Sequence, residues 1–213
     1  MTEARGGRYT VLWSIIAICT VIELVLSGAD FGILGSSTAR FDVFMLAAFW
    51  EGFLTDWPAQ YPLHPAAMFL THAFLHGSFL HMAINMASLA GLGKVIIVAI
   101  GQGRFLAVYL ISAIGGAAAF ALISDVDGPM VGASGALFGL LGLIIGREYR
   151  QARRRNTSLA PVVRTIGLLV VLNVVLWWAT EGHLAWQAHL GGAVTGFLAS
   201  FVVRSKPKRS AEG

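Results

Sequence analysis

Five polar or ionisable side chains lie within otherwise apolar stretches of the sequence: Glu23, His81, Asn85, Ser134 and His189. Such side chains are costly in a hydrocarbon environment and are therefore candidates for chemistry. A serine hydroxyl becomes a strong nucleophile when a neighbouring base takes its proton, and His189 is the candidate base on a separate stretch. The pair predicts acyl-transfer chemistry with Ser134 as the nucleophile.

The surroundings of Ser134 suit the binding of a negatively charged oxygen. The Gly-Ala-Ser-Gly sequence at residues 132–135 places the serine at a predicted helix N-terminus, where free backbone N–H groups can bind an oxyanion. The two glycines allow a substrate carbonyl to approach the backbone closely. His81 and Asn85 are four residues apart, so they share one helical face and could donate further hydrogen bonds.

The elements that must position these residues are membrane helices. The chain has 213 residues, of which 56% are hydrophobic and only 12% charged, so it is not a soluble domain. The candidate spans are about residues 11–28, 79–100, 104–123, 134–146, 163–180 and 186–203. These predict one all-α membrane domain over residues 11–203 with six transmembrane helices. The fourth stretch is short, so we expect the chain to dip into the protein before it and to hold Ser134 below the membrane surface.

The distribution of charge predicts the orientation. Basic residues gather in segments that would all face the cytoplasm: Arg5, Arg8, Lys94, Arg104, Arg147, Arg150, Arg153, Arg154, Arg155, Arg164, Arg204, Lys206, Lys208 and Arg209. Arg40 alone lies in an outer loop, together with most acidic residues: Asp30, Asp42, Glu51, Asp56, Asp125, Asp127 and Glu181. Both termini are therefore predicted to be cytoplasmic, which makes the site open to the outside. Residues 1–10 read as the start of a retained signal anchor and 204–213 as a disordered basic tail attracted to anionic headgroups.

Partners other than the bilayer are limited by the same pattern. The net charge of +4 does not indicate nucleic-acid binding, because the basic residues flank spans and form no single patch.

The outer connection between the first two spans, from about residue 29 to 64, is too apolar for a solvated linker and is expected to lie partly in the membrane interface. His64 and His183 read as solvated or interfacial loop residues.

Two faces of small residues predict how Ser134 and His189 meet. Serine and histidine side chains reach each other only if their helices pack almost backbone to backbone. The small residues recur along the fourth and sixth spans: Gly135, Gly139, Gly142, Gly146, and Ala188, Gly192, Gly196, Ser200. No Asp or Glu falls at the same depth to orient His189, so a Ser-His dyad is expected.

Each feature also has a plainer interpretation. Glycine and serine are ordinary packing residues in membrane helices, and a lone intramembrane histidine is as often a packing or proton-relay group as a catalyst. Glu23 is expected to pair within the bundle or reach toward the interface. His72 and His76 have metal-ligand spacing, but no glutamate lies between them, so we predict no metal site and a structural or gating role. A transporter or membrane-protein chaperone with a water-accessible cavity is the non-enzymatic alternative.

In combination, the motifs resemble those of the rhomboid family of intramembrane serine proteases. They are His81-x-x-x-Asn85, Gly132-x-Ser134-Gly135 and Ala188-His189-x-x-Gly192-x-x-x-Gly196, within a similarity that covers about residues 64–203. The resemblance implies a six-helix core, Ser134 as nucleophile, His189 as general base, and the Ser134 backbone, His81 and Asn85 as the oxyanion site. Gly132, Gly135, Phe138 and Gly192 would shape that site. Two departures are the missing Trp-Arg pair in the first outer loop and Phe138, which stands where the family often has tyrosine and could stack on His189.

The resemblance also implies the reaction. It is hydrolysis of a transmembrane segment of another membrane protein near its outward end, through an acyl-enzyme and without metal or cofactor. A substrate helix would pass beside the fifth span, where Trp177 and Trp178 lie near the outer interface, while residues 180–186 cap the cavity. A bacterial-type plasma membrane is the expected location.

Overall fold

The computed structural model describes residues 5–124 and 128–204, and within them the protein is built from helices. Their order is η1 (Arg5–Tyr9), α1 (Thr10–Asp30), α2 (Ala39–Ala47), η2 (Glu51–Leu54), α3 (His64–Thr71), η3 (His72–Phe74), α4 (Phe79–Ile100), α5 (Gln102–Ile123), α6 (Ser134–Arg155), α7 (Ala160–Ala179) and α8 (Trp186–Val202). In this part of the chain the sole β pairing is an isolated bridge between Phe49 and Met130. The predicted all-α class is confirmed.

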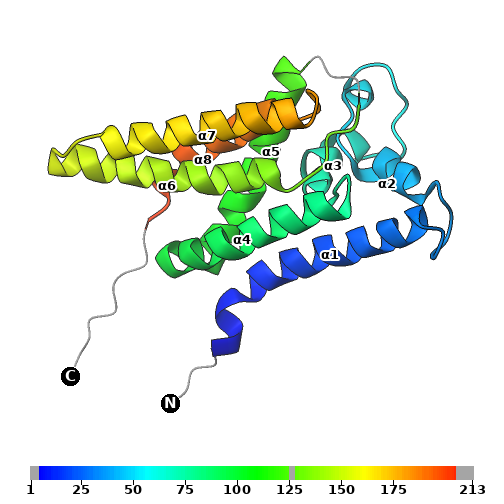
Figure 1. The fold of residues 1–213 in the computed structure, drawn as a ribbon, viewed down its shortest axis with the longest axis horizontal. Coiled ribbons are helices and arrows are strands. Elements are labelled where there is room, and N and C mark those ends of the chain that lie inside the picture. The colour runs from blue at the N-terminus through cyan, green and yellow to red at the C-terminus, as the bar shows by residue number, and fades with distance from the viewer. Residues whose placement is uncertain (1–4, 125–127, 205–213) are drawn as a thin grey trace.

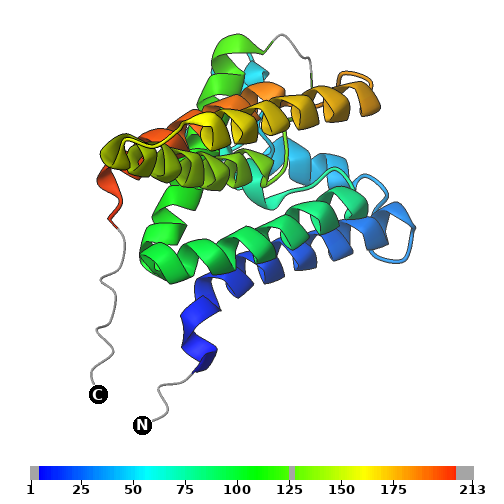
Figure 2. The same ribbon diagram turned by 60° about the vertical axis from the view of Figure 1, so that its left-hand side comes forward.

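The long helices form two groups joined by α5. Helices α6, α7 and α8 run side by side, α1 and α4 pair on the other side, and α5 passes between the groups (Figures 1 and 2). The described chain begins at η1 and ends after α8 at the same end of this bundle (Figure 2). The short helices α2 and α3 gather at the opposite end, close to the start of α4 (Figure 1).

Among the residues that the structure describes, four helices are long and apolar enough to cross a membrane: Gly7–Asp30, Phe79–Ile100, Gln102–Ile123 and Ala160–Ala179. Helices α6 and α8 fall outside this set. The apolar part of α6 stops near residue 146, where the fourth stretch was predicted to end, but the helix itself continues to Arg155 through an arginine-rich segment. Helix α8 has 17 residues. Both are packed against other helices on more than one side.

The contact between α6 and α8 is made by backbone, as the small-residue faces predict. A methyl group added to Gly192 would collide with the carbonyl oxygen of Gly135, and one added to Gly196 would collide with that of Gly139. In the same way, a side chain at Gly142 would meet the carbonyl of Ala193. The glycines therefore set the separation of the two helices that carry Ser134 and His189.

The segment between α1 and α4, residues 31–78, is called the first outer loop from here on. It is folded into the protein and has its own small core. Phe49 is fully buried and packs edge-on against Phe69 and Phe120, with ring centroids 5.1 and 5.9 Å apart. His64 is also fully buried, against the ring of Phe53 at 4.2 Å, so its prediction as a solvated or interfacial residue is wrong. His183, by contrast, is exposed. The aromatic residues that suggested an interfacial loop thus partly serve to pack it.

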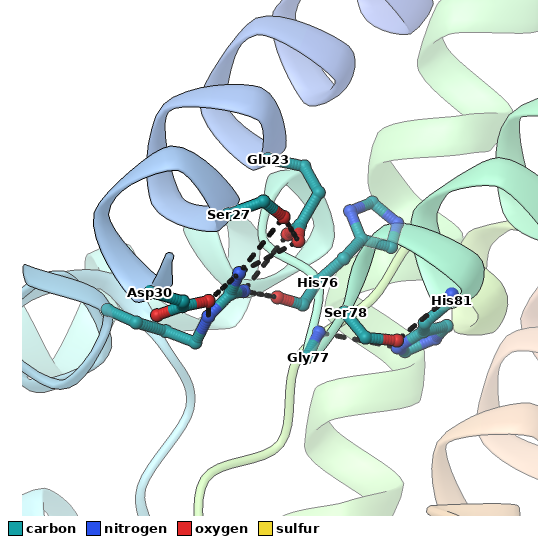
Figure 3. Close-up of polar contacts among 8 residues, drawn as sticks. Glu23, Ser27, Asp30, His76, Gly77, Ser78 and His81 are labelled. Carbon is teal, nitrogen blue, oxygen red and sulfur yellow. Dashed lines mark hydrogen bonds and ion pairs between the residues drawn. The ribbon is translucent and has the colours of Figure 1, made fainter. Parts of the chain in front are cut away.

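An ion pair ties this loop to α1 (Figure 3). The guanidinium of Arg40 in α2 donates to both carboxylate oxygens of Glu23, at 2.8 and 3.0 Å, and to Asp30 at 2.7 Å. It also donates to the main-chain carbonyl of His76 at 2.7 Å. Hydrogen bonding to Glu23 is the main reason that the pKa of Arg40 is raised above its ordinary value. Of the two alternatives predicted for Glu23, pairing is the one observed, although its partner Arg40 comes from the first outer loop and not from another span. Arg40 thus anchors a loop in which no Trp-Arg pair occurs.

Candidate active site

Ser134 is the first residue of α6, and the chain before it is held by the first outer loop. Met130 pairs with Phe49 through two backbone hydrogen bonds of 2.8 and 3.0 Å. Gly132 then donates its N–H to the carbonyl of His72 at 3.0 Å and turns the chain with a φ of +127°, a conformation that favours glycine. These contacts satisfy the non-helical backbone inside the protein and fix where α6 begins.

The structure brings Ser134 and His189 together. The Oγ of Ser134 lies 2.8 Å from Nε2 of His189, which comes from the first turn of α8. His189 is 4% exposed, whereas Ser134 is half-buried and can be reached. The close packing of Gly135 on the backbone of Ala188 is what makes this short contact possible.

Two further side chains hold the His189 ring. Phe138 stacks on it with a centroid distance of 4.2 Å and an interplanar angle of 6°, the contact that its position had suggested. Asn173 of α7 lies on the other side, with its Oδ1 2.6 Å from Nδ1 of His189. The imidazole is therefore fixed on a face and at both nitrogens.

Asn173 was missed by the sequence analysis, which searched only for a carboxylate to orient His189. The signal was present: Asn173 is a polar residue in the middle of an apolar span, which is the criterion that selected the other five candidates. Its pairing with His189 could not be read from the sequence, because it depends on the rotation of α7, which runs antiparallel to α8 (Figure 1), about its own axis.

His81 lies against the turn that precedes Ser134. A methyl group added to Gly132 would come within 3.0 Å of Nε2 of His81, so only glycine leaves room for this ring. The N–H of Gly77 donates to Nδ1 of His81 at 3.5 Å, which leaves the hydrogen on Nε2, the nitrogen facing the Ser134 turn (Figure 3).

Asn85 is buried one helical turn further along α4. One N–H of its amide donates to the carbonyl of His81 at 2.8 Å. Its second N–H remains to serve another acceptor, so the structure brings Asn85 to the helix face that carries His81 but records no hydrogen bond from it to Ser134.

His72 and His76 both contact other residues of the first outer loop or the start of α4. Nδ1 of His72 donates to the carbonyl of Met68 at 2.9 Å, and burial lowers the pKa of His72 to about 4. The buried ring of His76 packs edge-on against that of His81, with centroids 5.1 Å apart. Within residues 5–124 and 128–204, no group of three or more metal-binding side chains comes together.

An apolar cavity of about 450 Å³ opens beside His189, between α6, α7 and α8. Its lining includes Phe138, Asn173, Trp177, Trp186 and Leu190. Ser134 and His81 are not among its lining residues, whereas Asn173 and Phe138, which both contact the His189 ring, are.

The described residues thus combine a helical bundle of membrane type with a half-buried serine that is hydrogen-bonded to a buried histidine. Comparison with known proteins specifies the class of protein: the family model for the Rhomboid domain matches residues 64–206. This chain belongs to the rhomboid family.

Curated relatives agree with this assignment. RHOMBOID-like protein 5 of Arabidopsis thaliana is 34% identical over 139 residues, which are 63% of this chain and 43% of that protein. Rhomboid protease GluP of Bacillus subtilis (strain 168) is 32% identical over 144 residues, 68% of this chain and 27% of that protein. Putative rhomboid protease YdcA of the same organism is 28% identical over 150 residues, 66% of this chain and 68% of that protein. The chain thus spans less than half the length of the first two.

Proposed function

We propose that this protein is an intramembrane serine endopeptidase that cleaves transmembrane segments of other membrane proteins, with Ser134 as nucleophile and His189 as general base. The observation that carries the proposal is the 2.8 Å contact between Ser134 Oγ and His189 Nε2 at the start of two closely packed helices. Membership of the rhomboid family and the names of relatives such as Rhomboid protease GluP support the same activity.

Acylation follows from the hydrogen-bond geometry. Nε2 of His189 takes the hydroxyl proton as Ser134 Oγ attacks the carbonyl carbon of the scissile peptide bond, giving a tetrahedral intermediate. The imidazolium then gives this proton to the leaving amine, and the C–N bond breaks to leave an acyl ester on Ser134. Water, activated by the same nitrogen, hydrolyses the ester and restores the serine. Because Ser134 is half-buried and His189 almost wholly buried, a substrate and water can reach the serine while the base stays shielded.

The developing oxyanion has three candidate sources of hydrogen bonds. The N–H of Ser134 lies in the first turn of α6, where it has no intrahelical acceptor. The Nε2–H of His81 faces the same turn across Gly132. The second N–H of Asn85 completes the set. Removal of one such donor typically lowers the rate by roughly 10²–10³-fold.

We infer a topology of six spans, with α6 and α8 completing the four helices that meet the length and composition of a span. The described chain begins and ends at one end of the bundle (Figure 2), and arginines gather at that end of α6, which supports cytoplasmic termini and a site that opens outward. The cleaved segment would be cut near its outward end. It would approach past α7, the least buried of the four, where Trp177 lines the cavity beside His189 and Trp178 is 79% exposed.

The test is cleavage of a tagged single-span reporter by purified protein in liposomes, with covalent labelling by a fluorophosphonate in parallel. Ser134→Ala and His189→Ala should each lower cleavage by at least about 10³-fold and abolish labelling. Matched controls are Ser88→Ala, which alters an exposed serine of α4, and His183→Ala, which alters an exposed loop histidine. Both should cleave at the rate of the unmodified protein. Retained cleavage in either active-site variant, or failure of the unmodified protein to cleave and to label, would refute the proposal.

A further inference from the structure

We propose that Asn173 is the positioning residue of this active site: it holds His189 in the tautomer and orientation that make it a base for Ser134. The two side chains approach each other from α7 and α8, with Oδ1 of Asn173 2.6 Å from Nδ1 of His189. The inference deepens the proposed function and rests on it for its kinetic readout, but not for its spectroscopic one.

The orientation of the Asn173 amide is fixed by its second contact. Its Nδ2 donates to the carbonyl of Leu169 at 3.0 Å, one turn earlier in the same helix. A carbonyl oxygen can only accept, so the nitrogen must face Leu169 and the oxygen must face His189. A flipped amide would place two acceptors together, its own oxygen and the carbonyl of Leu169.

The tautomer of His189 follows from that orientation. Since Oδ1 of Asn173 can only accept, Nδ1 of His189 carries the hydrogen and donates it. A neutral imidazole has one N–H, so Nε2 is left with its lone pair directed at the Ser134 hydroxyl, 2.8 Å away. This is the arrangement that a general base requires. In the other tautomer, Nε2 would donate to the serine oxygen and could not take its proton.

The amide has a further effect once the proton has moved. The imidazolium formed in the transition state donates from Nδ1 to the amide oxygen, and a hydrogen bond to a charged donor is stronger than one to a neutral donor. The hydrogen bond between His189 and Asn173 is therefore stronger in the transition state than in the ground state, so it lowers the activation free energy. Loss of the acceptor is expected to lower kcat by about 10- to 100-fold, with little change in KM.

The helix that carries Asn173 adds a conformational condition. Only Val162 of α7 is buried, and the helix packs mainly along α6. Asn173 sits on its inward face, in line with Leu169 and Thr165, while most of the residues around it are exposed. A displacement of α7 by more than about 1 Å would stretch the 2.6 Å contact beyond hydrogen-bonding distance. Asn173 can therefore hold His189 as a base only while α7 lies in its observed position. A substrate that displaces α7 must let this helix return before cleavage.

The test uses Asn173→Ala, Asn173→Asp and a matched control, Thr165→Val. Thr165 is a half-buried residue on the same face of α7, and its hydroxyl donates to the carbonyl of Pro161 at 3.1 Å. The control therefore removes a hydrogen bond within α7 without touching His189. Asn173→Asp keeps an oxygen acceptor at the same place. Each variant is first compared with the unmodified protein by circular dichroism and melting temperature.

Two readouts decide the matter. Reporter cleavage should show a lower kcat for Asn173→Ala, recovery toward the original value for Asn173→Asp, and no change for Thr165→Val. ¹⁵N-histidine NMR of the protein in detergent, with His189 assigned among six histidines by loss of its signal in His189→Gln, should show hydrogen on Nδ1 in the unmodified protein and not in Asn173→Ala. Hydrogen on Nε2 in the unmodified protein, or an unchanged tautomer and kcat in Asn173→Ala, would overturn the proposal. If no substrate were cleaved, the proposed function would fail while the tautomer would still test the positioning.

Discussion

Replacement of Arg40 by methionine should detach the first outer loop from α1. Glu23 is fully buried, and its carboxylate is paired through two hydrogen bonds to this one guanidinium. Removal of one partner of a buried ion pair costs about 3–5 kcal/mol, because the other charge stays desolvated. The Ser27 hydroxyl, which donates to Glu23 at 2.9 Å, would remain but carries no charge to compensate it. The carbonyl of His76 also loses its donor at 2.7 Å. For a protein of this size, about 1 kcal/mol shifts the melting temperature by roughly 2–4 °C, so a decrease of roughly 6–20 °C is expected.

A double-mutant cycle separates the ion pair from the rest of the packing. Arg40→Met/Glu23→Gln should be less destabilised than Arg40→Met alone, because the second substitution removes the buried charge that the first leaves unpaired. Arg40→Lys should recover only part of the stability, since an ammonium cannot reach Glu23, Asp30 and the His76 carbonyl at once. Asp42→Asn alters an exposed residue of the same helix and serves as the control.

The measurement is thermal unfolding in detergent at pH 8, followed by circular dichroism, with limited proteolysis of residues 31–63 to report on the loop itself. Arg40→Met should become cleavable in this segment before the helices melt. If the effects of Arg40→Met and Glu23→Gln simply added in the double variant, or if the loop stayed protected, the ion pair would not be its anchor.

Two other predictions test the packing and the loop. Gly192→Ala should push α8 away from the Gly135 carbonyl and lower the free energy of unfolding by about 1–3 kcal/mol. It should also lower reporter cleavage by more than the loss of folded protein explains. Gly167→Ala, the control, has open space around it and should change neither stability nor cleavage. His72 lies in the loop outside the spans, and burial lowers its pKa to about 4, below the ordinary 6.5. Its contribution to stability is therefore intact above pH 6.5 and declines as the pH falls from 6.5 toward 4, by on the order of 3 kcal/mol in total. Melting curves from pH 4 to 8 should show a smaller decline in His72→Gln, and an identical decline would contradict this account.

Much of the fold could be predicted because lipid imposes simple rules on sequence. The start of α4 at residue 79, of α6 at Ser134 and of α8 at Trp186 matched the predicted stretches, since polar or glycine-rich turns interrupt apolar runs there. The glycine faces predicted the α6–α8 packing because only small residues let two backbones meet. The fourth apolar stretch did not show how far its helix extends, because arginines end an apolar span without ending a helix. Asp125, Asp127 and the tail 205–213 lie outside the described residues, and the predicted domain limits and disordered tail stay predictions.

What could not be predicted depends on contacts between segments that are far apart in sequence. The pairing of Asn173 with His189 requires the rotation of α7 about its own axis, which an apolar span does not encode when nearly every residue on it faces lipid. The burial of His64 follows from the loop core around Phe49 and Phe53, and a short irregular segment shows no periodicity from which such a core could be read. Periodic elements were therefore accessible and aperiodic ones were not.

The first outer loop and the nucleophile turn are best understood as one structural unit. A chain that enters the protein before α6 exposes backbone groups that neither lipid nor the helix can satisfy. The loop supplies their partners: the carbonyl of His72 accepts from Gly132, and Phe49 pairs with Met130. The segment that begins at His72 continues to the His76 carbonyl, which is bound by Arg40, and to Gly77, whose N–H fixes the His81 ring. A single stretch thus connects the buried ion pair on α1 to both sides of the Ser134 turn. The contact between Ser134 and His189 is held independently, by the glycines of α6 and α8. Weakening the Arg40 anchor should therefore disturb the oxyanion site before it disturbs this contact.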